Sequence, residues 1–92
     1  MFYIYVLKSM ESNELYVGYT SNLKQRLVEH NQGLNLSTKR YMPWEIIYYE
    51  ACLNKKDAIG RENYLKTTQG GRMLKRRLKE FFYEEKSKDL IS

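Results

Sequence analysis

An arginine and a histidine lie one helical turn apart in this chain, and either could act on an anion or a proton. The stretch LKQRLVEHN predicts a helix, in which one stripe at i, i+3, i+4, i+7 spacing consists of Leu23, Arg26, Leu27 and His30. The leucines should face the core, so Arg26 and His30 lie at the edge of the buried stripe. The simpler interpretation is structural: Arg26 packs its stem along apolar surface, and His30 caps the helix end.

A carboxylate occupies an equally unusual position further along the chain. Glu62 falls between Ala58 and Leu65 at helical spacing, on the face expected to be buried. Ionised carboxylates are rarely buried unless they are paired or bound to a metal. Metal binding is therefore one interpretation of Glu62, and a surface ion pair with Lys66 is the other.

Tyrosines are concentrated on the segments that must position these groups. The chain has nine tyrosines, and the two predicted strands nearest the N-terminus carry Tyr3, Tyr5, Tyr16 and Tyr19. Packing is their simplest explanation, but several buried hydroxyls would form a polar network. Gly18 weakens its strand, which indicates a bulge or the close approach of a ligand or another backbone.

The net positive charge comes from the second half of the chain, because the basic and acidic residues of the first half balance. The formal net charge is +5, and the segment from Lys66 to Lys79 has six basic residues and no acidic one. This favours a polyanionic partner, most commonly nucleic acid. A solvated helix face is the alternative.

Composition excludes several other classes of protein. A length of 92 residues predicts one domain. Cys52 is the single cysteine, so an intramolecular disulfide is impossible and a reducing cytoplasm is expected. One cysteine and one histidine cannot build a structural zinc site, and neither a membrane span nor a nucleotide-binding glycine motif is present.

The periodicity predicts a three-stranded sheet with helices packed on it, in the order β-β-α-β-α-α. The fold class is α/β (α+β), with an antiparallel-type sheet and a domain over residues 1–83. Asn54 should cap the second helix, in which Asp57 and Arg61 can pair one turn apart. The glycine pair at residues 70–71 should separate the second and third helices. The predicted strands are 2–9, 15–20 and 44–51, the helices 23–32, 55–68 and 72–83, and the polar tail 84–92.

These parts resemble the GIY-YIG nucleases. "YIY" at residues 3–5 and "YVG" at 16–18 are similar to the paired signature of that family, "YTSNLKQRLVEHNQG" to its first helix, and "AIGRENYLK" to its metal-site helix. The likeness extends from residue 2 to about residue 80 and is closest to small, standalone bacterial members. Three features depart from the pattern: Tyr3 replaces a glycine, Tyr19 replaces a lysine of some members, and residues 74–77 lack an asparagine that many members carry.

The resemblance implies an endonuclease that hydrolyses phosphodiester bonds in DNA with one divalent metal, Mg²⁺ or Mn²⁺. Glu62 corresponds to the metal ligand, and Arg26 to the arginine that stabilises the scissile phosphate. Tyr5 corresponds to the general base, and His30 could accept the proton of Tyr5. Tyr16 corresponds to a tyrosine that orients water or phosphate.

Basic residues would then contact the nucleic acid. The expected oligomeric state is a monomer or weak dimer, and a protein partner could supply specificity. Repair or recombination of DNA is the expected setting. Two other interpretations remain open: a non-catalytic nucleic-acid-binding module on the same scaffold, and a small interaction protein. The expected contacts are Lys39, Arg40, Lys66, Arg72, Lys75, Arg76 and Arg77.

Overall fold

The computed structural model describes the backbone of residues 1–91 and the side chains of residues 1–88. The chain divides into two compact units, Met1–Glu62 and a second that begins at Asn63. Each unit is described by itself, and the single domain predicted over residues 1–83 stays a prediction. Within the described residues, none of the helices combines the length and apolar character that a membrane crossing requires.

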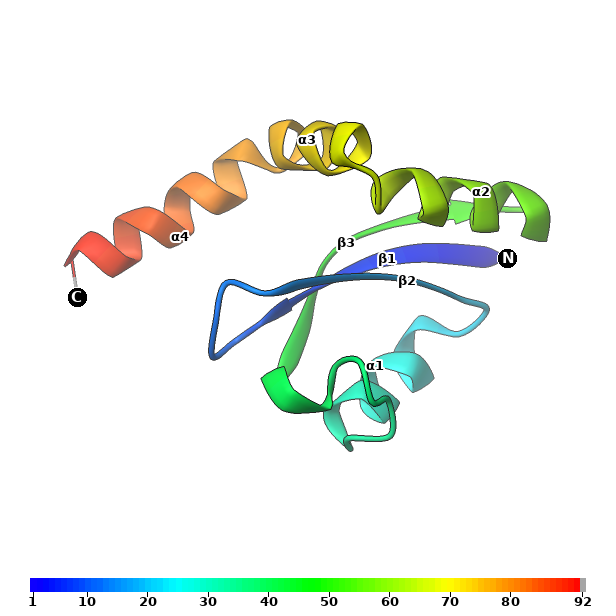
Figure 1. Cartoon of the computed structure of the whole chain (residues 1–92), viewed down its shortest axis with the longest axis horizontal. Coiled ribbons are helices and arrows are strands. Elements are labelled where there is room, and N and C mark those ends of the chain that lie inside the picture. Colours follow the sequence, from blue (N-terminus) through cyan, green and yellow to red (C-terminus); the bar gives the residue numbers. More distant parts are fainter. Residues whose placement is uncertain (92) are drawn as a thin grey trace. The chain divides into compact units, whose positions relative to one another are not determined.

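A three-stranded antiparallel sheet organises the first unit, as the sequence predicted (Figure 1). Its strands are β1 (Phe2–Ser9), β2 (Leu15–Thr20) and β3 (Trp44–Cys52), in the spatial order β2-β1-β3. Residues 4–7 of the central strand are all buried. Because successive side chains of a strand point to opposite faces, both faces of this sheet are covered.

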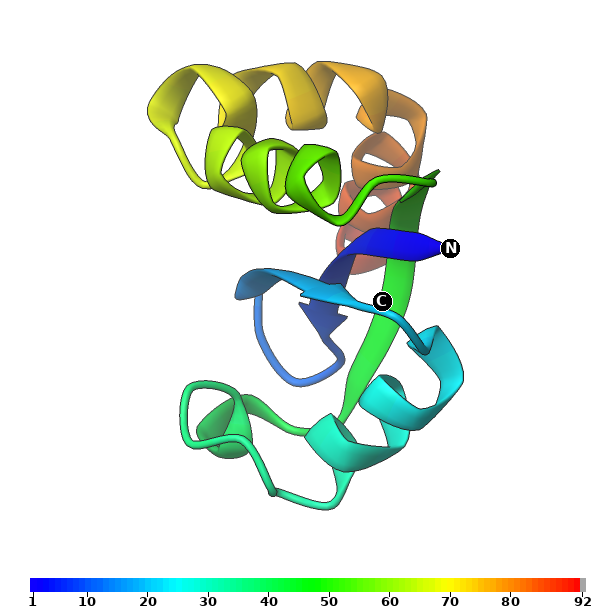
Figure 2. The ribbon, with the colours of Figure 1, turned by 90° about the vertical axis from the view of Figure 1, so that its right-hand side faces the viewer.

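Two helices lie on opposite sides of this sheet, as Figures 1 and 2 show. α1 (Leu23–Asn31) lies on one side, and the first turns of α2 (Lys55–Leu65) lie on the other. α1 begins where predicted, because the Asn22 side chain accepts a hydrogen bond from the Gln25 backbone N–H. It ends before Gly33, whose φ of +76° suits glycine at this position.

The core on the α1 side is built around one tyrosine of β1. Tyr5, Leu7 and Trp44 form a buried cluster, against which Leu23 and Leu27 of α1 pack. The chain between α1 and β3 is irregular, as expected, apart from the short 3-10 helix η1 (Lys39–Tyr41). Tyr41 and Met42 of this loop pack against the same cluster, so the loop lies on the same side of the sheet as Tyr5.

The helices of the second unit differ from those predicted. α2 ends at Leu65 rather than at residue 68. α3 (Thr68–Arg77) begins at Thr68 because the Thr67 hydroxyl caps it by accepting a hydrogen bond from the Gly70 N–H. The expected break at residues 70–71 is therefore wrong: both glycines lie inside α3. Gly70 is needed for packing, since a Cβ there would overlap the Tyr64 backbone.

The third predicted helix, residues 72–83, is in fact two helices. α3 ends at Arg77, the φ of −108° and ψ of 26° at the C-cap residue Leu78 interrupt the helical geometry, and α4 (Lys79–Ile91) follows. The expected polar tail, residues 84–92, continues α4 as far as Ile91, and residue 92 lies outside the described residues. The buried stripe predicted here is present in part, with Leu74 buried and Leu78, Phe81 and Phe82 partly buried.

Candidate active site

A buried hydrogen bond between Tyr5 and His30 forms the centre of the candidate site. Tyr5 of β1 is 2% exposed, and His30, in the last turn of α1, is fully buried. The Tyr5 hydroxyl lies 2.9 Å from His30 Nε2. His30 therefore points into the core instead of capping the helix end at the surface.

Gly18 makes room for the Tyr5 ring. The two residues are direct partners in the β1–β2 pairing, so they share a face of the sheet. A Cβ on Gly18 would overlap Cζ and Oη of Tyr5 and would lie 2.9 Å from Tyr16 Cε1. The close approach expected at Gly18 is thus made by two aromatic rings. The register shift of the sheet lies elsewhere, in the β1–β3 pairing, where Val6 pairs with Tyr48 and Leu7 with Ile46.

Tyr16 completes a cluster of three rings. Its ring centroid lies 5.1 Å from that of His30 and 6.3 Å from that of Tyr5. Since both contacts are tilted or edge-on, they are of the kind that aromatic pairs prefer. The cluster brings together three of the five predicted catalytic residues.

Thr38 contacts the second ring nitrogen of His30, and the sequence did not identify it. Its hydroxyl lies 2.7 Å from His30 Nδ1, and the residue is fully buried. The Trp44 indole N–H donates to the Thr38 carbonyl oxygen at 2.8 Å, which anchors this part of the loop. Thr38 belongs to an irregular segment without periodicity, so no sequence signal distinguishes it from the neighbouring Ser37.

Burial and nearby charges determine the protonation states of this pair. Burial raises the pKa of Tyr5 well above its ordinary value of 10.0, and the nearby Tyr16 and Glu62 raise it further while Arg26 opposes them. Burial also lowers the pKa of His30, and the Arg26 cation adds to that effect. At neutral pH the site therefore contains a protonated phenol beside a neutral imidazole.

Arg26 lies at the open side of the site. Its side chain is 41% exposed and lies 3.5 Å from the Glu29 carboxylate, a weak contact one turn along α1. It borders a shallow hollow of about 190 Å³ at the start of α1. The remaining lining residues of this hollow are Thr20, Ser21, Asn22, Gln25 and Glu29.

Glu62 lies on α2 as its spacing predicted. The residue is half-buried, between the buried Ala58 and Leu65. Its negative charge contributes to the raised pKa of Tyr5, so the carboxylate acts electrostatically on the phenol. No cluster of three or more potential ligands from His, Cys, Asp and Glu occurs among the described residues. A single half-buried carboxylate fits Mg²⁺, which keeps most of its water and takes one or two carboxylates.

The helix that carries Glu62 is attached to the sheet by an ion pair. Arg61 donates from Nε and Nη2 to the two carboxylate oxygens of Glu50 on β3, at 2.9 and 3.0 Å. Arg61 thus reaches across to the sheet, and the pair of Arg61 with Asp57 stays a prediction. Tyr48 also donates to Glu50, at 2.8 Å. Glu50 was not a predicted functional residue.

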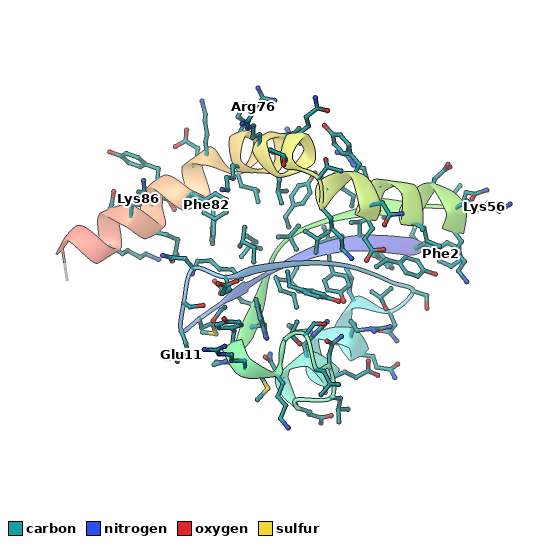
Figure 3. The ribbon with its side chains drawn as sticks, in the orientation of Figure 1. Phe2, Glu11, Lys56, Arg76, Phe82 and Lys86 are labelled. Carbon is teal, nitrogen blue, oxygen red and sulfur yellow. The ribbon has the colours of Figure 1, made fainter. Side chains whose placement is uncertain are left out.

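The predicted nucleic-acid contacts fall into two groups. Lys39 and Arg40 are exposed on η1, directly after Thr38 in the chain. The others belong to the second unit, where Figure 3 shows Arg76 extending from α3. These exposed residues are Lys66, Arg72, Lys75, Arg76 and Arg77.

Comparison with known proteins identifies the family of the chain. A model of the GIY-YIG catalytic domain matches residues 1–75. The chain belongs to the GIY-YIG family. The match includes all five predicted catalytic residues, and it makes the chain a member of a nuclease family, with nucleic acid as the substrate class and a divalent metal as the usual cofactor.

Several bacterial relatives of this GIY-YIG chain are named UPF0213 proteins. One from Clostridium perfringens is 39% identical over 67 residues, which is 72% of this chain and 71% of the relative. One from Pediococcus acidilactici is 41% identical over 68 residues, 71% of this chain and 68% of the relative. One from Bacillus licheniformis is 36% identical over 88 residues, 95% of this chain and 84% of the relative. No solved structure matches the chain significantly.

Proposed function

We propose that this protein is a metal-dependent endonuclease that hydrolyses phosphodiester bonds in DNA, with residues 1–83 as its catalytic domain. The observation that carries the proposal is the 2.9 Å contact between Tyr5 Oη and His30 Nε2. A phenol with a raised pKa is a poor base by itself at neutral pH. A neutral imidazole in contact with it gives the phenol proton a place to go.

The proposed reaction begins with proton transfer through Tyr5. The attacking water gives a proton to Tyr5 Oη while the Tyr5 proton passes to His30 Nε2, so the phenol stays neutral and the imidazole becomes a cation. The water oxygen forms a bond to phosphorus as the bond to the leaving sugar oxygen breaks, and the leaving oxygen takes a proton from solvent. His30 then returns its proton to solvent.

Charge complementarity supports the remaining roles. Arg26 would neutralise the charge that builds on the phosphate oxygens, and Tyr16 would orient water or phosphate beside the imidazole. Glu62 would hold the metal, Mg²⁺ or Mn²⁺. When bound, the metal supplies positive charge next to the phosphate and the leaving oxygen.

A catalytic site is favoured over a passive binding module for two reasons. The Glu62 carboxylate would repel a phosphate unless a cation lay between them. Binding alone also has no use for a phenol buried against an imidazole, since phosphate contacts come from exposed cations, helix N-termini and surface hydroxyls.

The test is cleavage of labelled substrates with Mg²⁺ or Mn²⁺. The panel contains single strands, duplexes, flaps and four-way junctions of DNA, with RNA counterparts. We expect metal-dependent cutting of at least one DNA. Glu62→Gln should lower the cleavage rate by about 10²-fold or more, because the metal contributes strongly to stabilising the transition state. Glu14→Gln, an exposed carboxylate in the β1–β2 turn, is the matched control. No cutting, or equal cutting by Glu62→Gln, would refute the proposal.

The basic residues give a separate binding test. Replacing Arg76 and Arg77 by alanine should reduce the slope of log K against log salt by about 2, because each lost phosphate contact removes about 0.9. Lys86→Ala with Lys88→Ala removes the same charge from α4 and is the control. An unchanged slope in the Arg76 and Arg77 variant would exclude α3 from the interface.

A further inference from the structure

Thr38 and His30 share a buried contact that determines which imidazole nitrogen carries the proton. His30 has two hydrogen-bond neighbours, Tyr5 Oη on Nε2 at 2.9 Å and Thr38 Oγ1 on Nδ1 at 2.7 Å. A neutral imidazole has one N–H, so one nitrogen donates and the other accepts. The direction of the two bonds follows from the partners of the two hydroxyl groups.

With the proton on Nδ1, every hydroxyl has a partner. His30 Nδ1–H donates to Thr38 Oγ1, the Thr38 O–H donates to the Asn35 carbonyl oxygen at 3.4 Å, and the Tyr5 O–H donates to Nε2. No buried side-chain oxygen or nitrogen of the described residues is then left unsatisfied.

With the proton on Nε2, the network loses one bond and leaves the phenol hydrogen without an acceptor. Thr38 would donate to Nδ1 and give up its bond to Asn35. His30 Nε2–H would donate to Tyr5 Oη, so the phenol hydrogen, at a residue only 2% exposed, would have no acceptor among the described side chains. A buried donor without a partner costs about 1–3 kcal/mol. The Nδ1–H tautomer is therefore the favoured one.

We infer that Thr38 is a positioning residue: its hydroxyl accepts the Nδ1–H of His30 and so holds the imidazole in the tautomer whose bare Nε2 can take the Tyr5 proton. The same bond orients the ring, since it holds the nitrogen opposite to the one that faces Tyr5. The backbone of Thr38 is held independently, because Trp44 donates to its carbonyl oxygen and its own N–H donates to the Asn35 carbonyl oxygen. Thr38 thereby connects the loop after α1 to the reaction.

The effect on catalysis rests on the proposed nuclease function, whereas the tautomer itself does not. In the Nε2–H form, His30 would offer Tyr5 a donor instead of an acceptor, and the proton path from water through the phenol would be closed. Thr38 should consequently influence kcat and leave substrate affinity unchanged, because it is buried behind the imidazole and contacts no substrate.

Nitrogen NMR of the imidazole tests the inference directly. His30 is the only histidine of the chain, so a long-range ¹⁵N–¹H spectrum of the full-length labelled protein contains two ring nitrogens and needs no assignment. At pH 8 we expect Nδ1 to be protonated and Nε2 to be bare. Thr38→Val preserves shape but lacks the hydroxyl, and its spectrum should move toward the Nε2–H form. Thr38→Ser should keep the native pattern, and so should the neighbouring control Ser37→Ala.

Two outcomes would overturn the inference: a native spectrum with a protonated Nε2, or a Thr38→Val spectrum identical to the native one. The native spectrum decides the first even if Thr38→Val does not fold. In the cleavage assay, Thr38→Val should lower kcat by about 10-fold or more, since general acid–base groups contribute 10²–10⁴-fold. KM should stay within about twofold, and Thr38→Ser should recover most of the rate. If no variant cuts any substrate while the spectra behave as expected, the nuclease proposal fails and the role of Thr38 in holding the tautomer stands.

Discussion

Replacing Gly18 by alanine should destabilise the protein and displace Tyr5. A Cβ at this position overlaps Cζ and Oη of the Tyr5 ring. The ring is the far end of a side chain, which could in principle move, but it is buried and bonded to His30. Relief of the overlap therefore requires the Tyr5–His30 bond to break or the strands to shift.

The magnitude follows from three opposing contributions. Overpacking of a core costs about 1–3 kcal/mol. Separation of Tyr5 from His30 leaves a buried polar group unpaired, at about 1–3 kcal/mol. Alanine restores about 0.5–1 kcal/mol of stability because it has less conformational entropy than glycine in the unfolded chain. The net loss is about 3 kcal/mol, equivalent to about 12–24 °C in Tm for a domain of this size.

Thermal unfolding followed by circular dichroism measures this loss. Gly60→Ala is the matched control, because Gly60 lies in a helix and a Cβ there meets nothing within 4 Å. That substitution should stabilise by about 0.5–1 kcal/mol. If Gly18→Ala changed the free energy of unfolding by no more than Gly60→Ala does, and left the His30 nitrogen signals unchanged, the packing argument for the Tyr5 ring would be refuted.

The other predictions concern His30 and the attachment of α2. The pKa of His30 is lowered from 6.5, so its imidazole C–H signals should titrate with a midpoint below that value. The free energy of unfolding should then fall as the pH drops below about 6.5, because the unfolded chain binds a proton that the folded chain does not; a midpoint at or above 6.5 would contradict this. Glu50→Gln should weaken the partly exposed pair with Arg61, lower stability by about 0.5–1 kcal/mol, and raise the metal concentration needed for half-maximal cleavage. Glu45→Gln on the same strand is its control, and an equal metal requirement in both variants would exclude a role for Glu50 in positioning Glu62.

Local signals in the sequence predicted most of the first unit. The three strands and α1 begin and end within a residue of the predicted positions, because β-branched runs, the Asn22 cap and Gly33 act on neighbouring residues only. Helical spacing also placed His30 at the edge of a buried stripe and Glu62 on a face expected to be buried. Such rules fail where a helix depends on distant packing, and α3 begins before its two glycines because Gly70 fits against Tyr64.

The partners of the site residues came from tertiary structure alone. Tyr5 meets His30 across 25 residues, Arg61 reaches Glu50 across 11, and Thr38 reaches the imidazole from a loop without periodicity. Residue types and spacing indicated which groups could do chemistry, because those properties are carried by a single helix or strand. Which nitrogen faces the phenol, and which ring fills the space above Gly18, depend on strand register and on how the loop after α1 packs beneath the sheet. Those are properties of the folded chain, since they arise only when segments distant in sequence are brought into contact.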